Sequence, residues 1–509
     1  MVRLHARSTL ARAVDGSIEQ PDETLVLAAY ARWGVRCVER LQGEFAFVID
    51  DHAHGRVIAA CDAQGTRPLF WGETPTAWAF GSAPSVVAAL PELDRRLREE
   101  SIAEFLRSGV LETRTATWHR SVHRIPAAHV LEASAGAAVL RRYWDFPVPP
   151  IRRAASDAAV IEEFDALLRD AVRDRIGDAP ASILLSGGLD STMLAATARA
   201  VSPAPLTALT VASERWAPSE DVPLAEATAR HLGLPWMRID IERFLPCADL
   251  ADRRYDPAPV DEPTLAAWRA MAQAASESAS IALYGEDGDT LAFGPGLWTQ
   301  LRTEGVRSTA SRWLAYRRTE GARPWIGLEW RRRMHRLLGG DRTLRPPWLR
   351  ASVPSAPRDV PVAHPTRARA VTAFSSPMWD ALYDALSPAV TRAPVLFSLP
   401  LTDPRLMAFV FSLPAVPWLQ RKLLYRRAMA GRLPTAVLAR PKTPLDGIDE
   451  ARVAAWRALG GAHTPVSPAL DRWVDRAQLA AVWRSGSVDE VVASWRVLQL
   501  DAWLAGRDS

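Results

Sequence analysis

The segment Ala181-Ser-Ile-Leu-Leu-Ser-Gly-Gly-Leu-Asp-Ser191 decides the fold of most of this chain. Its first five residues form a short apolar run that predicts a buried strand, and the residues from Thr192 onward predict a helix. The two glycines between them permit a tight turn and close backbone approach to a ligand. Free N–H groups at the start of the helix make this loop a cradle for an anion, and Ser186 and Ser191 add hydroxyl donors.

Asp190 is the unusual member of this loop. A carboxylate beside a phosphate site would repel its ligand unless a cation lay between them, so Mg²⁺ is the economical explanation. A plain Ser/Gly turn accounts for any single feature, but the whole string Ser186–Ser191 between a strand and a helix favours phosphate binding. The chain contains no GxxxxGK[ST] segment, which excludes the kinase-like phosphate loop.

Strands and helices alternate on both sides of this loop. Helices are expected at Val160–Ile176, Thr192–Val201 and Leu224–Leu232, with strands at Leu206–Val211 and Met237–Ile239. That alternation predicts a parallel, doubly wound α/β sheet. Beyond about Gly296 the pattern becomes mostly helical, so we expect C-terminal helices to pack against the sheet.

The first part of the chain carries dense β signals instead. After a helix that begins at Glu23, strands are expected at Glu44–Asp50, Arg56–Cys61, Leu69–Trp71 and Thr76–Phe80, followed by a closing helix near Ser101–Ser108. This pattern predicts an antiparallel, layered α+β domain. The proline-rich segment Phe146–Ile151 reads as a linker. We therefore expect two domains, residues 1–145 and 155–509.

Composition limits the function classes. The net charge of +4 comes from 62 basic and 58 acidic residues, so the total gives no reason to expect nucleic-acid binding. No signal-peptide pattern and no apolar run of about eighteen residues occurs, and we expect no membrane span. Cys37, Cys61 and Cys247 lie far apart without CxxC spacing, which is typical of a protein of the reducing cytoplasm.

Lysine is almost absent from the chain. Only Lys422 and Lys442 occur, and both fall within one short segment. Arginine and lysine differ in shape and hydration, so positions that keep lysine are candidates for specific chemistry. Chance clustering of two residues is the alternative interpretation.

Two segments carry a resemblance to known proteins. Ser186–Ser191 resembles the pyrophosphate loop of the ATP-pyrophosphatase superfamily, which implies adenylation and not phosphoryl transfer. Tyr284-Gly-Glu-Asp-Gly-Asp289 resembles the SGEGSDE-type segment of asparagine synthetases, although Tyr284 and Thr290 depart from that pattern. A solvated turn is the competing interpretation of the second segment, because Gly/Asp-rich turns are common.

A third, longer match lies near the C-terminus. It comprises Pro400–Leu406, Phe409, Ser412–Pro414, Lys422, Arg426–Met429, Leu433–Pro434 and Arg440–Leu445. These residues resemble the helical part of the asparagine-synthetase fold, and both lysines fall on the lysine positions of that family. The Arg-Pro-Lys-Thr-Pro-Leu string resembles lasso-peptide macrolactam cyclases in particular.

The resemblance implies a role for each matching residue. Glu286 would act near the nucleophile as a base or charge-orienting group, Lys422 would contact phosphate, and Lys442 would stabilise charge on the acyl-adenylate and the tetrahedral intermediate. Asp190 and Asp289 would hold Mg²⁺. The residues expected to bind ATP are Leu184, Ser186, Gly187, Gly188, Leu189, Asp190, Ser191, Val211, Tyr284 and Gly285.

The first domain resembles the glutaminase domain of the same family. The matching segments are Asp22–Thr24, Glu39–Phe47, Asp62–Phe70 and Phe80–Ser82. An active glutaminase needs cysteine after Met1, and this chain has Val2 there; the opening strands of the family are missing as well. Either Met1 is not the true start, or the domain is truncated and structural, and ammonia delivery is not expected in either case. We therefore expect an inactive, truncated Ntn-hydrolase-like αββα domain, and an amine that arrives with the substrate.

The combined reading is an ATP-dependent lasso-peptide cyclase that forms an isopeptide ring and releases AMP and pyrophosphate. The resemblance implies a precursor peptide as substrate, with a leader peptidase and a leader-recognition protein as partners. A small-molecule amide synthetase and a non-catalytic peptide-binding scaffold are the alternatives. β-Lactam synthetases place tyrosine where this chain has Glu286, which argues mildly against the first of these.

One region matches no family motif. Residues Gly305–Arg350 are dense in arginine, including Arg331–Arg333, with interleaved tryptophans at 313, 325, 330 and 348. A basic, aromatic surface suits an acidic or amphipathic peptide, and nucleic acid is the competing reading. Helices with solvated arginines and buried tryptophans are at least as good an explanation.

Overall fold

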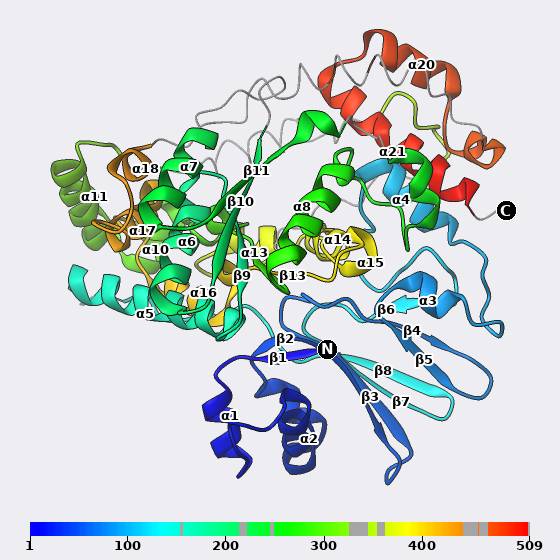
Figure 1. Ribbon diagram of the computed structural model, residues 1–509, viewed down its shortest axis with the longest axis horizontal. Coiled ribbons are helices and arrows are strands. Elements are labelled where there is room, and N and C mark those ends of the chain that lie inside the picture. Colours follow the sequence, from blue (N-terminus) through cyan, green and yellow to red (C-terminus); the bar gives the residue numbers. More distant parts are fainter. Residues whose placement is uncertain are drawn as a thin grey trace.

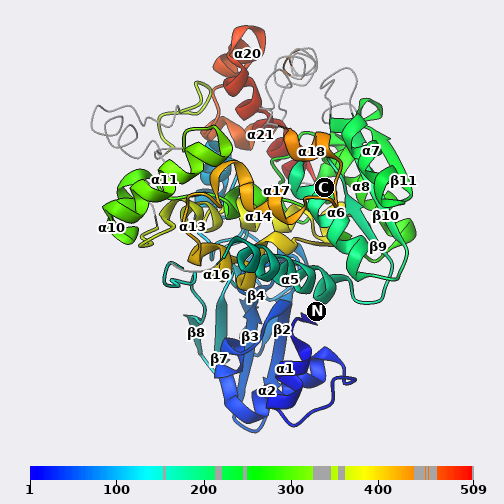
Figure 2. The same cartoon turned by 90° about the vertical axis from the view of Figure 1, so that its left-hand side faces the viewer.

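The computed structural model describes residues 1–152, 156–212, 221–244, 249–324, 345–353, 362–440 and 467–506, together with Val453 and Arg457. Figures 1 and 2 show two antiparallel sheets on one side of the molecule and a domain built on a parallel sheet on the other. In this part of the chain no helix is both long enough and apolar enough to cross a membrane.

The N-terminal domain contains two antiparallel sheets, ordered β1-β2-β3-β7-β8 and β5-β4-β6. Its elements are β1 (Val2–Leu4), α1 (Arg7–Ala13), α2 (Asp22–Trp33), β2 (Gly43–Asp51), β3 (Arg56–Cys61), β4 (Phe70–Glu73), β5 (Trp78–Gly81), α3 (Pro84–Ala88), α4 (Glu99–Ser108), β6 (His123–Arg124), β7 (His129–Ser134) and β8 (Ala137–Arg142).

Alternation along the strands sets the order of layers. Phe47 and Ile49 face α1 and α2, whereas Ala46 belongs to the cluster between the two sheets. In the second sheet Trp71 packs into that inter-sheet cluster, and Phe70 packs on the other face with residues of α3. Because successive side chains of a strand point to opposite faces, the layers follow as helix, sheet, sheet, helix.

One expectation for this domain was wrong. The helix at 101–108 does not close the domain, because β6, β7 and β8 follow it and β7 pairs with β3 in the larger sheet. The helix α4 instead packs against the C-terminal helices, with Phe105 and Trp118 in the same cluster as Trp495 and Trp503. The strands and helix expected before it are present.

The second domain is built on a five-stranded parallel sheet ordered β11-β10-β9-β12-β13. Its elements are α5 (Asp157–Ile176), β9 (Ala181–Leu184), α6 (Leu189–Val201), β10 (Leu206–Ala212), α7 (Asp221–Leu232), β11 (Trp236–Asp240), α8 (Leu265–Ser278), β12 (Ile281–Leu283), α9 (Gly288–Leu291), α10 (Leu297–Glu304), α11 (Val306–Glu320), α13 (Ala368–Phe374), α14 (Met378–Ala385), α15 (Pro388–Thr391), β13 (Leu396–Ser398), α16 (Pro404–Ser412), α17 (Leu423–Ala428), α18 (Thr435–Ala439), α20 (Arg476–Ser485) and α21 (Val488–Ala505).

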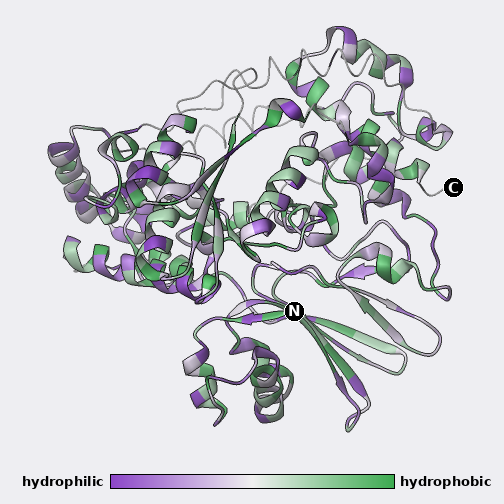
Figure 3. Ribbon diagram, viewed as in Figure 1, coloured by the Kyte–Doolittle hydropathy of each residue, from purple (hydrophilic) through white to green (hydrophobic). Residues whose placement is uncertain are grey.

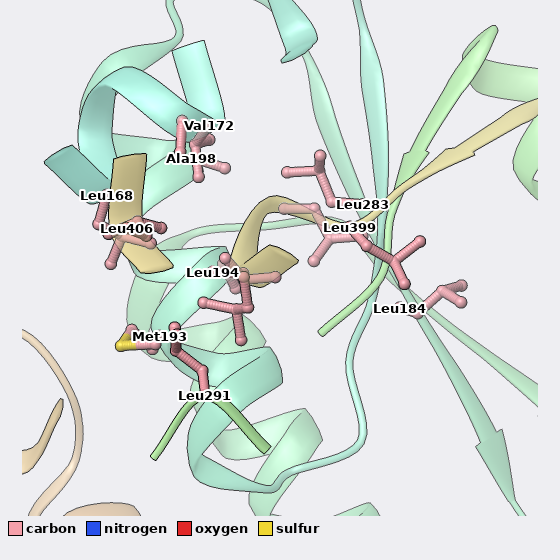
Figure 4. Packing of buried hydrophobic residues seen from close by; sticks show 14 of the residues in the cluster. Leu168, Val172, Leu184, Met193, Leu194, Ala198, Leu283, Leu291, Leu399 and Leu406 are labelled. Carbon is pink, nitrogen blue, oxygen red and sulfur yellow. The ribbon is translucent and has the colours of Figure 1, made fainter. Parts of the chain in front are cut away.

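The doubly wound sheet that the strand–helix alternation predicts is confirmed, and its core lies between the strands and the flanking helices. Figure 4 shows Leu184 and Leu283 of neighbouring strands with Met193 and Leu194 of α6 in one cluster. The helical expectation beyond Gly296 is correct for most elements, but β13 adds a fifth strand from that region. Burial of the α6 face against the sheet fixes where α6 begins and so positions the loop before it.

Candidate active site

The loop between β9 and α6 presents hydroxyl and amide groups at the carboxyl edge of the parallel sheet. Ser186 Oγ lies 3.0 Å from Ser191 Oγ, which also accepts from the Ser186 N–H at 3.1 Å. The Gly188 N–H donates to Ser186 Oγ at 3.3 Å, and Gly188 is the N-cap of α6. Because the first N–H groups of a helix have no intrahelical acceptors, the loop offers donors to an anion.

The second motif begins where β12 ends. The Tyr284 N–H donates to Ser398 O at 2.9 Å. Asp287 adopts a left-handed backbone with φ of 64°, and Thr290 Oγ1 donates to Asp287 Oδ1 at 2.6 Å. β12 lies beside β9, and the chain order of the strands reverses direction between them. Such a switch point is where ligands bind in open α/β sheets.

Lys422 connects the two motifs. Its Nζ lies 2.5 Å from Asp190 Oδ2 and 2.8 Å from Asp289 Oδ1. The backbone at Arg421 and Lys422 is left-handed, with φ of 51° and 56°. Such conformations are costly for residues with a Cβ and occur preferentially at functional sites. The fold thus gathers Asp190, Asp289 and Lys422 from three distant segments into one cluster.

Negative charge dominates this cluster. Burial raises the pKa of Asp190, Lys422 lowers it, and Asp289 and Glu286 raise it. Burial raises the pKa of Asp287 to about 6, and the charges of Glu286 and Asp289 act in the same direction. Lys422 pairs with Asp190 and Asp289, and the nearby carboxylates of Glu286 and Asp287 add further negative charge, which favours the binding of a cation.

Asp190 and Asp289 fit the ligand preferences of Mg²⁺. Oδ1 of Asp190 is buried and has no hydrogen-bond partner in the described part of the chain. Among the described residues no group of three or more His, Cys, Asp or Glu is positioned to hold a metal by itself. Mg²⁺ usually binds one or two carboxylates and completes its shell with substrate phosphates and water. The pair therefore suits a metal shared with a nucleotide.

Two glycines allow the motifs to approach each other. Gly187 has a φ of +74°, and a Cβ there would lie 2.2 Å from Asp221 O. A Cβ on Gly285 would lie 3.0 Å from the backbone N and Cα of Ser191. Close backbone approach explains both glycines without reference to the ligand.

The other predicted nucleotide contacts lie at the same edge of the sheet. Leu184 ends β9 and is buried, and Leu189 begins α6. Val211 lies two residues beyond the residue that pairs with Leu184 in β10, and it is 41% exposed. Val211 is the next-to-last residue of β10, and its exposed side chain is available to an apolar surface of a ligand.

Glu286 lies beside Tyr284. Burial, followed by the Glu286 charge, raises the pKa of Tyr284 well above its usual value. The charge of Glu286 also raises the pKa of Asp190. The predicted role of Lys442 concerns a residue outside the described part of the chain.

Sequence reasoning missed Tyr425. Its hydroxyl donates to Gly288 O at 3.0 Å, and its ring stacks on Phe164 with centroids 5.4 Å apart. Tyr425 lies three residues after Lys422, one turn along α17, which is the signal that would have found it. It supports the backbone that carries Asp289.

Neither described cysteine is suited to nucleophilic chemistry. Cys37 and Cys61 are buried and free. Burial raises the pKa of Cys37 to about 11, and burial also raises the pKa of Cys61. Only the thiolate is an effective nucleophile, so these side chains are structural.

The Arg/Trp-rich region is partly described, and that part is explained by packing. Trp348 is fully buried in the cluster with the C-terminal helices. Trp313 is half-buried and donates to Gln300 Oε1 at 3.2 Å. The helix α11 is largely hydrophilic (Figure 3) and buries only Thr309 and Tyr316. The remaining tryptophans and the arginine triplet lie outside the described residues.

Two family comparisons agree with this architecture. The family described as asparagine synthase matches residues 163–505, and the glutamine amidotransferase domain matches residues 6–144. The chain belongs to the asparagine synthase family. Enzymes of this family use ATP, and membership places the chain among ATP-dependent carbon–nitrogen ligases, as the sequence predicted.

Individual relatives carry the same family name. A stretch of 178 residues is 30% identical to the glutamine-hydrolysing asparagine synthetase 3 of Bacillus subtilis, and it covers 35% of this chain and 29% of that protein. A Mycobacterium tuberculosis protein named for asparagine synthetase is 28% identical over 546 residues, which cover 95% of this chain and 79% of that protein.

Proposed function

We propose that this protein activates a carboxylate as an acyl-adenylate and transfers the acyl group to an amine, with a peptide as substrate. A carboxylate oxygen attacks the α-phosphorus of ATP, and the bond to the bridging oxygen of the β-phosphate breaks, which releases pyrophosphate. The amine nitrogen then attacks the acyl carbon, the bond to AMP breaks, and an isopeptide ring closes. The carboxylate is that of an Asp or Glu side chain, and the amine is the N-terminus of the same peptide.

The gathering of Asp190, Asp289 and Lys422 beside the loop Ser186–Ser191 carries this proposal. The loop offers N–H and hydroxyl donors to pyrophosphate, and Lys422 adds a point charge that contacts both carboxylates. Mg²⁺ held by Asp190 and Asp289 would neutralise phosphate charge as it develops. In ATP-pyrophosphatases, which Ser186–Ser191 resembles, the same loop type keeps pyrophosphate.

Glu286 and Lys442 are proposed to act at the acyl carbon. Glu286 would accept the proton that the amine loses on attack. Lys442 would stabilise the negative charge of the tetrahedral intermediate.

A peptide that carries its own amine would not need ammonia from the N-terminal domain. Release of ammonia from glutamine by this fold requires a thiolate, and the described thiols Cys37 and Cys61 are buried with raised pKa values. The partners proposed with such a peptide are a leader peptidase and a leader-recognition protein.

Pyrophosphate release and the identity of the nucleotide product test this proposal. Candidate core peptides are expected to stimulate formation of AMP and pyrophosphate in equal amounts, together with a product lighter by one water. Formation of ADP would contradict adenylation. Stimulation by a small β-amino acid and not by peptides would support a small-molecule amide synthetase, and no stimulation at all would favour a binding scaffold.

Replacement of Lys422 tests the site itself. Lys422→Met is expected to lower peptide-dependent pyrophosphate release by about 100-fold or more, because a fixed charge at a phosphate site contributes several kcal/mol. The control is Arg427→Met, in the same segment, where ion pairs to Asp157 and Glu320 lie at the surface and contribute little. Equal activity of both variants would remove Lys422 from the proposed mechanism.

A further inference from the structure

A cavity of about 220 Å³ lies between the two domains. The N-terminal domain contributes Phe70, Phe105 and Trp118 to its walls, and the ligase domain contributes Trp268, Ala385 and Val390. These side chains are mostly apolar. The cavity is therefore suited to an apolar group the size of a large side chain.

The charges that line the cavity leave one carboxylate without a counter-ion. Five of the six charged lining residues form ion pairs, whereas Glu262 has none in the part of the chain that the structure describes. Oε1 of Glu262 accepts hydrogen bonds from the N–H and the hydroxyl of Thr264 at 2.7 and 2.5 Å. The paired residues are Arg114 with Asp380, Arg124 with Asp384, and Asp261 with Arg496 outside the lining. An apolar cavity with an unpaired carboxylate favours a cationic ligand.

The cavity adjoins the activating loop. The ring of Trp268, which lines the cavity, meets the ring of Tyr284 edge to face at 5.7 Å. The charges of Glu262 and Glu286 both raise the pKa of Tyr284, which places the Tyr284 hydroxyl within the influence of both carboxylates. A ligand in the cavity would therefore be separated from Tyr284, two residues before Glu286, by the ring of Trp268.

We propose that this cavity binds the amine-bearing end of the substrate, an apolar primary amine whose ammonium pairs with Glu262. The face of Trp268 adds a cation–π contact, and the apolar arm fills the space between Phe105 and Ala385. The role of this site in amide formation rests on the proposed ligase function, but binding of an amine does not. In this arrangement the N-terminal domain supplies half of a substrate site and no ammonia.

Calorimetric titration with phenethylamine tests the site on the full chain without turnover. Wild-type protein is expected to bind phenethylamine, and phenethyl alcohol at least about tenfold more weakly, since a hydrogen bond between two charged groups is stronger than one to a neutral hydroxyl. Glu262→Gln keeps an acceptor for Thr264 and is expected to weaken phenethylamine binding by about tenfold. Equal binding of the amine and the alcohol, or no effect of Glu262→Gln, would overturn the proposal.

A substitution that fills the cavity provides a second, independent test of the proposal. Ala385→Phe, at a half-buried lining residue of α14, is expected to abolish phenethylamine binding. Ala274→Phe enlarges a half-buried alanine of α8 that does not line the cavity, and it is expected to bind as the wild type does. Retained binding in Ala385→Phe would exclude the cavity, and Glu262→Gln decides the question if that variant does not fold. Failure of the proposed function appears separately, as ADP formation or absence of pyrophosphate release.

Discussion

At Gly288 the backbone of one motif touches the carboxylate of the other. A Cβ on Gly288 would lie 2.3 Å from Cγ of Asp190 and 2.5 and 2.6 Å from its two oxygens. Nothing larger than hydrogen fits there while Asp190 keeps its contact with Lys422. This glycine therefore sets the distance between the two carboxylates that are proposed to hold Mg²⁺.

Gly288→Ala is expected to displace Asp190 and to raise the Mg²⁺ concentration that half-saturates pyrophosphate release by about tenfold or more, as for other groups that orient metal ligands. The measurement is a magnesium titration of pyrophosphate release. Gly294→Ala is the matched control, because the nearest atoms to its new Cβ lie at 3.6 and 3.7 Å. A normal magnesium dependence in Gly288→Ala would show that Asp190 does not need its present position.

At the scale of elements, α4 and α21 form one unit although they lie far apart in the sequence. Trp118, which follows α4, meets Trp503 of α21 with ring centroids 5.3 Å apart, and Trp503 Nε1 donates to Asp256 O at 3.1 Å. Figure 1 shows α4 beside α21. The segment after β5 is therefore held by the far end of the chain.

Trp503→Ala is expected to lower the free energy of unfolding by about 3–5 kcal/mol, because it empties a fully buried site and leaves Asp256 O without its donor. Urea denaturation followed by circular dichroism measures the change. Trp298→Ala serves as control, since that side chain is 72% exposed. A single transition is expected, because the shared cluster and the buried ion pairs couple the domains; a separate early transition of the N-terminal domain would contradict this coupling.

At the scale of the whole molecule, a buried ionic network joins the domains. Arg175 of α5 lies 3.0 Å from Glu44 Oε1 of β2 and 2.9 Å from Asp403 Oδ2. His5 Nδ1 lies 3.7 Å from the same Asp403 oxygen, and all four side chains are buried. Burial, followed by the charge of Arg175, lowers the pKa of His5 to about 3.

This network predicts acid sensitivity. The unfolded chain binds a proton at His5 near its ordinary pKa of 6.5, whereas the folded chain does so only near 3. Between these values the unfolded state holds more protons, so the folded state loses stability as pH falls from 6.5 toward 3. His5→Gln is expected to reduce the loss between pH 7 and pH 4 by an amount on the order of 3 kcal/mol.

Urea denaturation at several pH values compares this variant with the wild type. His52→Gln is the control, because the His52 side chain is 89% exposed. Parallel pH profiles of wild type and His5→Gln would mean that His5 is not held neutral by the fold.

The local sequence pattern was sufficient to predict much of the fold and the anion-binding loop of the site. The alternation around Ala181–Ser191 predicted the parallel sheet and placed Ser186–Ser191 between a strand and a helix, whereas only the structure shows that Tyr284–Asp289 follows a strand, β12. The short strands β12 and β13 were not predicted, because a run of three residues is too short to show a hydrophobic periodicity. The closing role given to the helix at 101–108 was wrong, since nothing local indicates that its partner is α21.

The sequence by itself determined the family and the chemical groups available to the site. These are a glycine–serine loop for an anion, carboxylates for a cation, and only two lysines in 509 residues. These are properties of residue type and spacing along a few turns of chain. Only the tertiary structure decided that Lys422 contacts both Asp190 and Asp289, that Gly288 makes room for Asp190, and that the two domains enclose a cavity beside Tyr284. Those relations depend on which distant surfaces bury one another, and burial is a property of the whole chain.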